Sequence, residues 1–284
     1  MYNLITRGDT VPARIGQILA GEFGVPVGSV EVSQDDDHEN RNWEAAVACE
    51  CARIRGDLDW SVTVAVDESV RTQPSEEQVA LAVARGLKVS VLFPDKETIP
   101  WIWRVALPTG HFTHARVTEP ESDIEGLTVD AVELAVADFP NAAVIKFPER
   151  IRELYLVSPV LEQHAPAGAT EETTRVCQCV ANWERLTIRM AGGWPPSSWY
   201  PAEMYQEDLE LRGLVEQDMA RLPEAEQAAV RKALGELDVT FQELTLDDGG
   251  SALAMATGTP VDVMEKRDWY WRRRPITLPW DSMG

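Results

Sequence analysis

The chain has 284 residues, of which 44% are hydrophobic, and it carries a formal net charge of −21. This length and apolar content suffice for a packed core in one large or two ordinary domains, so extended disorder is not expected. The negative charge repels phosphate backbones and anionic lipids, so we expect no nucleic-acid and no membrane partner. The same charge favours basic proteins or cations as partners.

Two features of the sequence point to a reducing, cytoplasmic environment. No stretch approaches the roughly 18 consecutive apolar residues of a membrane span, and residues 1–23 lack the apolar run of a signal peptide. The four cysteines form two Cys-x-Cys pairs, Cys49/Cys51 and Cys177/Cys179. Four cysteines are too few for a disulfide scaffold of this length.

The first half of the sequence predicts a sheet built from hairpins. Apolar and polar residues alternate strictly over 58–66, and the strand-like run 43–54 before it completes a hairpin. A second hairpin is predicted at 101–117. Shorter strands are expected at 29–33, 88–93 and 142–147, and the segment 127–137 fits either a helix or a strand.

Two helices are predicted in the same half. Residues 10–23 carry apolar side chains at helical spacing. The second helix begins with a capping box from Ser75 to Gln78, in which each side chain can bond the other residue's amide, and it closes near Gly86.

Beyond the small-residue segment 164–169 the apolar period changes from two to about 3.6. This segment is the best candidate for a linker, so the expected domains are a sheet domain, 1–165, and a mainly helical domain, 170–284. The fold class is therefore α+β: a mostly antiparallel sheet with two helices, followed by a helical domain containing a helical hairpin over 202–245.

The second arm of that hairpin carries an apolar seam of two heptads. Its members step by four, three, four and three residues: Val230, Leu234, Leu237, Phe241 and Leu244. Two heptads are short for a coiled coil, so packing within the chain is expected first. Self-association as a scaffold subunit is the alternative.

The candidate partner-binding residues are acidic or aromatic and fall in three groups. They are Asp35, Asp36, Asp37 and Glu39 in a charged loop, Trp194, Trp199 and Tyr200 in a proline-rich loop, and Glu203, Glu207 and Glu210 along one helix face. The acidic loop lacks the ligand spacing of a calcium loop, and the helix lacks the Glu-x-x-His of di-iron bundles. The aromatic loop fits either a recognition surface or a cap on the helical hairpin.

Other candidate metal ligands have simpler interpretations. In a strand, Cys-x-Cys spacing places both sulfur atoms on one face about 7 Å apart, so buried core thiols are favoured over zinc. His111 and His114 point to opposite faces of a strand, so we expect ordinary surface histidines. We therefore assign no metal, no cofactor and no catalytic residue.

The segment 267–274 carries four arginines interleaved with three aromatic residues. Such a segment can stack on RNA bases. Because the rest of the chain is strongly acidic, we expect it to dock on the protein's own acidic helices instead.

The sequence contains no nucleotide-binding glycine motif, no His-Glu-x-x-His and no Gly-x-Ser-x-Gly. Our first hypothesis is a non-catalytic acidic binding protein that occupies a basic protein partner, as immunity-type inhibitors do. A hydrolase or transferase that uses dispersed carboxylates, with or without a divalent metal, is the second. The third is a scaffold subunit of an assembly. No sequence feature specifies an oligomeric state.

Overall fold

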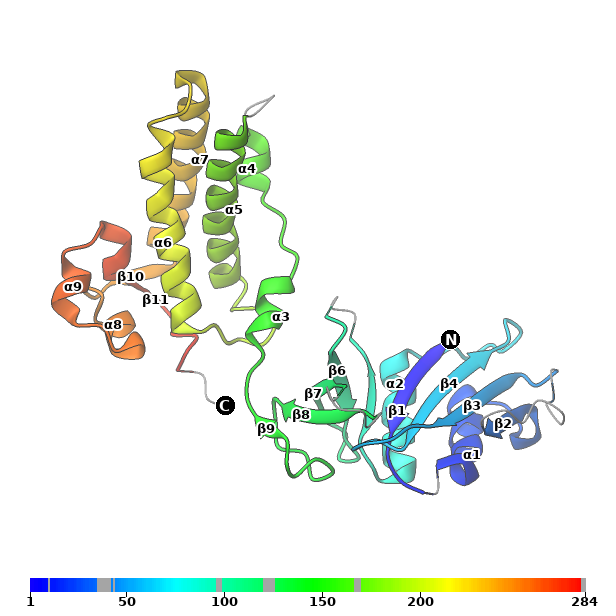
Figure 1. Cartoon of the computed structure of the whole chain (residues 1–284). Helices are drawn as coiled ribbons and strands as arrows, with labels where there is room; N and C mark the ends of the chain where they lie inside the picture. Colours follow the sequence, from blue (N-terminus) through cyan, green and yellow to red (C-terminus); the bar gives the residue numbers. More distant parts are fainter. Residues whose placement is uncertain are drawn as a thin grey trace. The chain divides into compact units, whose positions relative to one another are not determined.

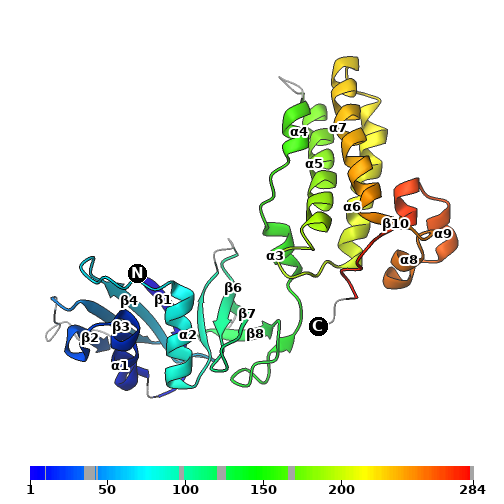
Figure 2. The same cartoon turned by 180° about the vertical axis from the view of Figure 1, so that it is seen from behind.

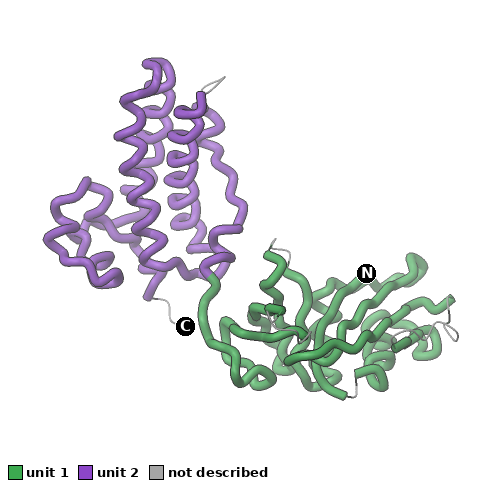
Figure 3. Tube along the Cα trace, in the orientation of Figure 1, with its two compact units in different colours: residues 1–147 green, residues 148–284 purple. Residues whose placement is uncertain are grey.

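The computed structural model describes residues 1–9, 11–34, 42, 44–95, 99–119, 126–165 and 170–281. The chain divides into two compact units, Met1–Phe147 and Pro148–Gly284, which Figure 3 colours separately. This division precedes the segment 164–169 that the sequence predicts as the linker. Two short helices upstream of that segment belong to the second unit, and Ile151 in the first of them is fully buried in its core.

Unit 1 contains a nine-stranded sheet with the order β2-β3-β4-β1-β5-β6-β7-β8-β9 among the described residues. The strands are Tyr2–Thr6 (β1), Val30–Gln34 (β2), Val47–Arg53 (β3), Trp60–Val66 (β4), Val91–Pro94 (β5), Ile102–Ala106 (β6), Phe112–Thr118 (β7), Thr128–Val132 (β8) and Ala143–Val144 (β9). Neighbouring strands are antiparallel except in the parallel pairs β2/β3 and β8/β9. The predicted, mostly antiparallel sheet is therefore confirmed.

Both predicted hairpins are present. Strand β3 pairs with β4, and alternate residues of the two strands are buried over most of their length. Strand β6 pairs with β7 in the same way. Within the ambiguous segment 127–137 only residues 128–132 form a strand, β8, and the strand expected at 142–147 is reduced to the two residues of β9. Phe147, at the end of the expected strand, is buried with Ile99 and Ile102.

Helices α1 (Val11–Phe23) and α2 (Glu76–Leu87) cover one face of the sheet, as the sequence predicts (Figures 1 and 2). Their apolar sides share one core cluster with the inward residues of β1, β3, β4 and β5. The predicted capping box is present, because the Gln78 amide donates to Ser75 Oγ at 3.2 Å and the Ser75 amide donates to Gln78 Oε1 at 2.8 Å.

The predicted end of α2 at Gly86 is wrong. The helix continues to Leu87 and ends at Lys88, which adopts a left-handed conformation with φ of 62°. Gly86 has a packing role instead, since a Cβ there would lie 2.5 Å from Cδ1 of Ile18 on α1. The missing side chain lets the two helices approach closely.

Unit 2 is mainly helical, with α4, α5, α6 and α7 side by side (Figure 1). The helices are Pro148–Glu153 (α3), Pro159–His164 (α4), Glu171–Ala191 (α5), Ala202–Met219 (α6), Glu224–Glu243 (α7), Ser251–Thr257 (α8) and Val261–Glu265 (α9). Two short strands, Thr245–Asp247 (β10) and Arg273–Pro275 (β11), pair antiparallel. Helices α6 and α7 occupy the two predicted arms, and both pack on α5.

The predicted seam of α7 is used within the chain. Its first four members are buried in the core of unit 2, and Leu244 packs against that core from a partly buried position. Within the core, Phe241 lies against Trp183 of α5, with ring centroids 4.4 Å apart. The apolar periodicity of α7 is therefore accounted for by packing on α5 and its neighbours.

A buried carboxylate joins α4 to α5. Glu184 is only 1% exposed and accepts hydrogen bonds from the amides of Val160 and Leu161, at 2.7 and 3.0 Å. These amides belong to the first turn of α4, where backbone N–H groups have no partner inside the helix. The negative charge also suits the positive end of the helix dipole.

None of the described helices is both long enough and apolar enough to cross a membrane.

Candidate functional site

The predicted acidic residues of α6 lie together on its solvent-facing side. Glu203, Glu207 and Glu210 are all exposed, and their i, i+4, i+7 spacing aligns them along the helix. We call these three residues the acidic stripe. Glu207 pairs with the exposed Arg152 of α3 at 3.3 Å.

The solvent-facing side of α6 carries no cation of its own helix. Its only basic residue, Arg212, has a side chain that is 3% exposed and is turned into the core. The next residue along the stripe, Leu214, is 43% exposed. The exposed side of α6 therefore combines carboxylates with one apolar side chain, a combination that attracts cationic groups.

The other acidic candidates, Asp35, Asp36, Asp37 and Glu39, lie outside the residues that the structure describes.

Of the aromatic candidates, two belong to the core of unit 2. Trp194 is 4% exposed and Tyr200 is 1% exposed, with ring centroids 5.1 Å apart, whereas Trp199 is partly buried. This arrangement matches the interpretation of the loop as a cap on the helices. It leaves Trp194 and Tyr200 little surface to offer a partner.

The Tyr200 hydroxyl is hydrogen-bonded to a buried carboxylate that the sequence analysis did not identify. Asp208 on α6 accepts hydrogen bonds from the Tyr200 hydroxyl at 2.6 Å and from Nδ2 of Asn182 on α5 at 2.7 Å. Burial raises the pKa of Asp208 to about 6, although both hydrogen bonds favour the ionised form. The helical periodicity of α6 places Asp208 on the core side, and this signal was available in the sequence.

Asn182 also lines an open groove between α5 and α6, with a volume of about 510 Å³. From α5 the groove is lined by Arg175, Gln178, Cys179, Asn182 and Arg185, and from α6 by Leu211, Leu214 and Asp218. Arg175 pairs with Asp218 at 2.9 Å. The α5 wall thus presents two guanidinium groups, and the α6 wall combines two leucines with the carboxylate of Asp218.

In unit 1 an imidazole bridges two carboxylates. His114 on β7 lies 2.8 Å from Glu133 through Nδ1 and 3.2 Å from Asp95 through Nε2, and all three side chains are at most 16% exposed. The expectation of a surface histidine is therefore wrong. Because both ring nitrogens face a carboxylate, neither is available to take a proton from a substrate.

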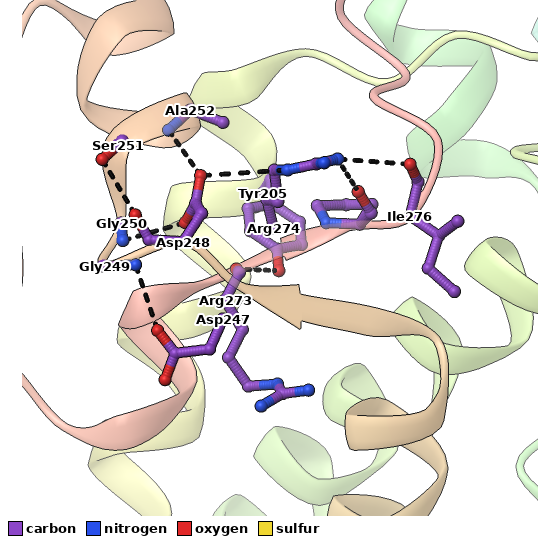
Figure 4. A network of polar contacts seen from close by, with 11 residues as sticks. Tyr205, Asp247, Asp248, Gly249, Gly250, Ser251, Ala252, Arg273, Arg274 and Ile276 are labelled. Atoms are coloured by element: carbon purple, nitrogen blue, oxygen red, sulfur yellow. Dashed lines mark hydrogen bonds and ion pairs between the residues drawn. The ribbon is translucent and has the colours of Figure 1, made fainter.

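The arginine-rich segment docks on the chain itself, as predicted, but its ion pairs are not made with the acidic helices. Figure 4 shows Arg274 facing Asp248, with 4.0 Å between Nε and Oδ2, and the Arg273 carbonyl accepting from the Tyr205 hydroxyl at 3.1 Å. Asp247 pairs with Arg272 at 3.3 Å. The acidic partners therefore lie at the end of β10 and in the turn that follows it.

The aromatic residues between these arginines are largely removed from solvent. Tyr270 and Trp271 are buried in the core of unit 2, and Arg267 lies 3.9 Å from the centroid of the Trp271 ring. Their faces are used within the protein, which leaves little aromatic surface for stacking on bases.

The two cysteine pairs lie in different units. Cys49 and Cys51 are buried on β3 with their sulfur atoms 3.9 Å apart, closer than the expected 7 Å, and Cys177 and Cys179 are partly buried on α5. A hydrogen bond with Cys51 and burial raise the pKa of the Cys49 thiol well above its usual value. Within the described ranges, no group of three or more His, Cys, Asp or Glu residues is arranged to hold a metal ion.

Comparison with family models, curated proteins and solved structures gave no significant match.

Proposed function

We propose that this chain is a non-catalytic acidic binding protein that occupies a basic protein partner through the acidic stripe of α6. The observation that carries the proposal is that this helix displays three exposed carboxylates while its one arginine is buried. In its narrower form, the partner is a basic enzyme or toxin whose active site the chain covers, as immunity-type inhibitors do.

The electrostatics of the whole chain support this proposal. The net charge of −21 attracts a cationic protein from beyond contact distance and raises the rate of encounter. Salt at 0.15 M screens exposed charges beyond roughly 8 Å, so the attraction weakens as ionic strength rises. Leu214, at 43% exposed, adds an apolar contact beside the carboxylates.

The two other hypotheses draw less support from the described residues. An enzyme of the second type needs carboxylates of raised pKa that face a substrate, but Asp208 is 7% exposed and both of its oxygens accept hydrogen bonds from the protein. The scaffold hypothesis was motivated by the seam of α7, and four of its five members are buried within unit 2.

The test is a comparison of two triple variants of the full chain. The first, E203Q/E207Q/E210Q, neutralises the acidic stripe. The second, E153Q/E243Q/E265Q, removes three exposed charges from other parts of unit 2. Each tagged variant and the wild type are exposed to a lysate at about 50 mM salt, and the retained proteins are identified by mass spectrometry.

We expect the wild type and the second variant to retain the same basic protein, and the first variant to lose it. The purified partner should then associate with the wild type at a rate that falls steeply between low and high salt. Retention of the same proteins by both variants, or of no basic protein by the wild type, would contradict the proposal.

A further inference from the structure

A second site is indicated by the groove between α5 and α6. Arg175, Gln178, Asn182 and Arg185 follow each other at i, i+3, i+7 and i+10 on α5, so they line one side of that helix. Leu211 and Leu214 form the apolar part of the opposite wall, which also carries Asp218, a carboxylate already paired with Arg175. The volume of about 510 Å³ lies within the roughly 300–1,000 Å³ range of small-molecule sites.

The polar side chains of the α5 wall differ in whether they already have a hydrogen-bond or ion-pair partner. Asn182 donates to Asp208, and Arg175 is paired with Asp218. Arg185 makes no hydrogen bond or ion pair with the residues that the structure describes, and its Nε is shielded from solvent without an acceptor. A buried N–H without an acceptor is costly, so an acceptor for Nε of Arg185 would be favourable.

The chemistry of the missing partner follows from the two walls. A guanidinium presents parallel N–H donors that match the two oxygens of a planar carboxylate. The leucines beside it favour an apolar body attached to that carboxylate. Because the chain as a whole repels anions, specific contacts in the groove must hold such a ligand.

We propose that the groove between α5 and α6 binds a small organic carboxylate, with the carboxylate on Arg185 and the apolar body against Leu211 and Leu214. The polar residues of this site are distinct from Glu203, Glu207 and Glu210, although Leu214 borders both surfaces. The site does not depend on the proposed function, and each can fail without the other.

The test uses phenylacetate, phenyl phosphate and the neutral phenylacetamide as probes of the full chain. Binding is followed by NMR titration of backbone amides. Phenylacetate should bind saturably with a Kd on the order of 1 mM, as befits a fragment of this size, and should shift amide signals of α5 and α6. Phenylacetamide should bind at least about tenfold more weakly, because it lacks the charge.

Arg185→Gln should weaken phenylacetate binding by about tenfold or more, and Arg185→Lys by less, because lysine keeps the charge but not the paired donors. Arg231→Gln is the matched control, since Arg231 is exposed on α7 and its guanidinium donates to Gln227. This control should leave the affinity unchanged.

Leu214→Glu is a second test that leaves Arg185 in place. Leu214 is partly exposed, so the substitution is compatible with folding, and its carboxylate should compete for the groove and abolish binding. Unchanged urea midpoints verify that each variant is folded. Absence of saturable binding, equal affinity for the neutral amide, tighter binding of phenyl phosphate than of phenylacetate, or undiminished binding by Arg185→Gln would overturn the proposal.

Discussion

Arg212 on α6 and Asp238 on α7 are joined by two hydrogen bonds, of 3.3 Å from Nε to Oδ1 and 2.8 Å from Nη2 to Oδ2. The indole N–H of Trp183 on α5 donates to the same Oδ1 at 3.0 Å. The guanidinium also lies 5.2 Å from the centroid of the Tyr270 ring. One charged pair therefore connects three helices of unit 2 with the segment that follows α9.

Arg212→Ala should lower the free energy of unfolding by about 3–5 kcal/mol, because it leaves a partly buried carboxylate without its cation. Asp238→Ala should have a comparable effect. The double variant should cost much less than the sum of the two, since each single change already breaks the pair. Urea unfolding of the four proteins checks this cycle, and additive losses would show that the pair is not coupled.

The stability of unit 2 should depend on pH through Asp208. Its pKa is about 6 in the folded chain and roughly 3.9 when unfolded. The folded state therefore binds the proton on Asp208 more tightly than the unfolded state does. The stability that this proton contributes is fully present below pH 4 and is lost as the pH rises through 6. The loss amounts to about 3 kcal/mol for a shift of two units.

Asp208→Asn removes this titration and serves as the reference. The difference in unfolding free energy between wild type and variant should change between pH 4 and 7 and stay constant above pH 7. In addition, Tyr200→Phe should raise the pKa of Asp208 further, because it removes a donor that favours the carboxylate. A difference that does not vary with pH would show that Asp208 is already ionised at pH 4.

Because His114 lies between Asp95 and Glu133 in unit 1, we expect His114→Phe to lower the stability of the protein. The phenyl ring has a similar shape but no nitrogen, so Glu133 loses its hydrogen bond with the ring and Asp95 loses the ring nitrogen 3.2 Å away, at a site with little solvent. We expect a loss of about 1–3 kcal/mol. His111→Phe is the control, because His111 is exposed. Equal effects of the two substitutions on urea unfolding would argue against the bridge.

Two substitutions of Asp248 should lower stability to different extents. Its carboxylate accepts from the amides of Gly250 and Ala252, at 2.9 and 2.8 Å, and so holds the start of α8 (Figure 4). Asp248→Ala should cost about 1–2 kcal/mol, as loss of a helix cap does. Asp248→Asn should cost less, because the amide oxygen still accepts. Hydrogen exchange of the first amides of α8 should follow the same order.

Local patterns predicted the individual elements well. The strict alternation over 58–66 predicts β4, and the pair Ser75 and Gln78 predicts the start of α2, because both signals depend only on neighbouring residues. The exposure of Glu203, Glu207 and Glu210 follows from helical spacing in the same way. Strand order is different. The central position of β1 between β4 and β5 results from pairing across more than 50 residues, which no local pattern records.

Long-range side-chain partners were missed for the same reason. Glu133 lies 19 residues after His114, and Asp208 lies 26 residues after Asn182. Neither spacing corresponds to the repeat of a helix or a strand, so the sequence gives no sign that these residues meet. The aromatic loop also gave a mixed signal, because the tryptophan and tyrosine side chains that favour interfaces equally favour a core once their polar atoms find partners.

The core around α5 and α7 also uses Met264, Tyr270 and Trp271, which come after both helices in the chain. During translation, α5 through α7 therefore leave the ribosome before the side chains that complete their packing exist. Until Tyr270 has emerged, the part of the Trp183 ring that it covers remains open to chaperones or aggregation. The second unit should consequently fold late and all at once rather than helix by helix.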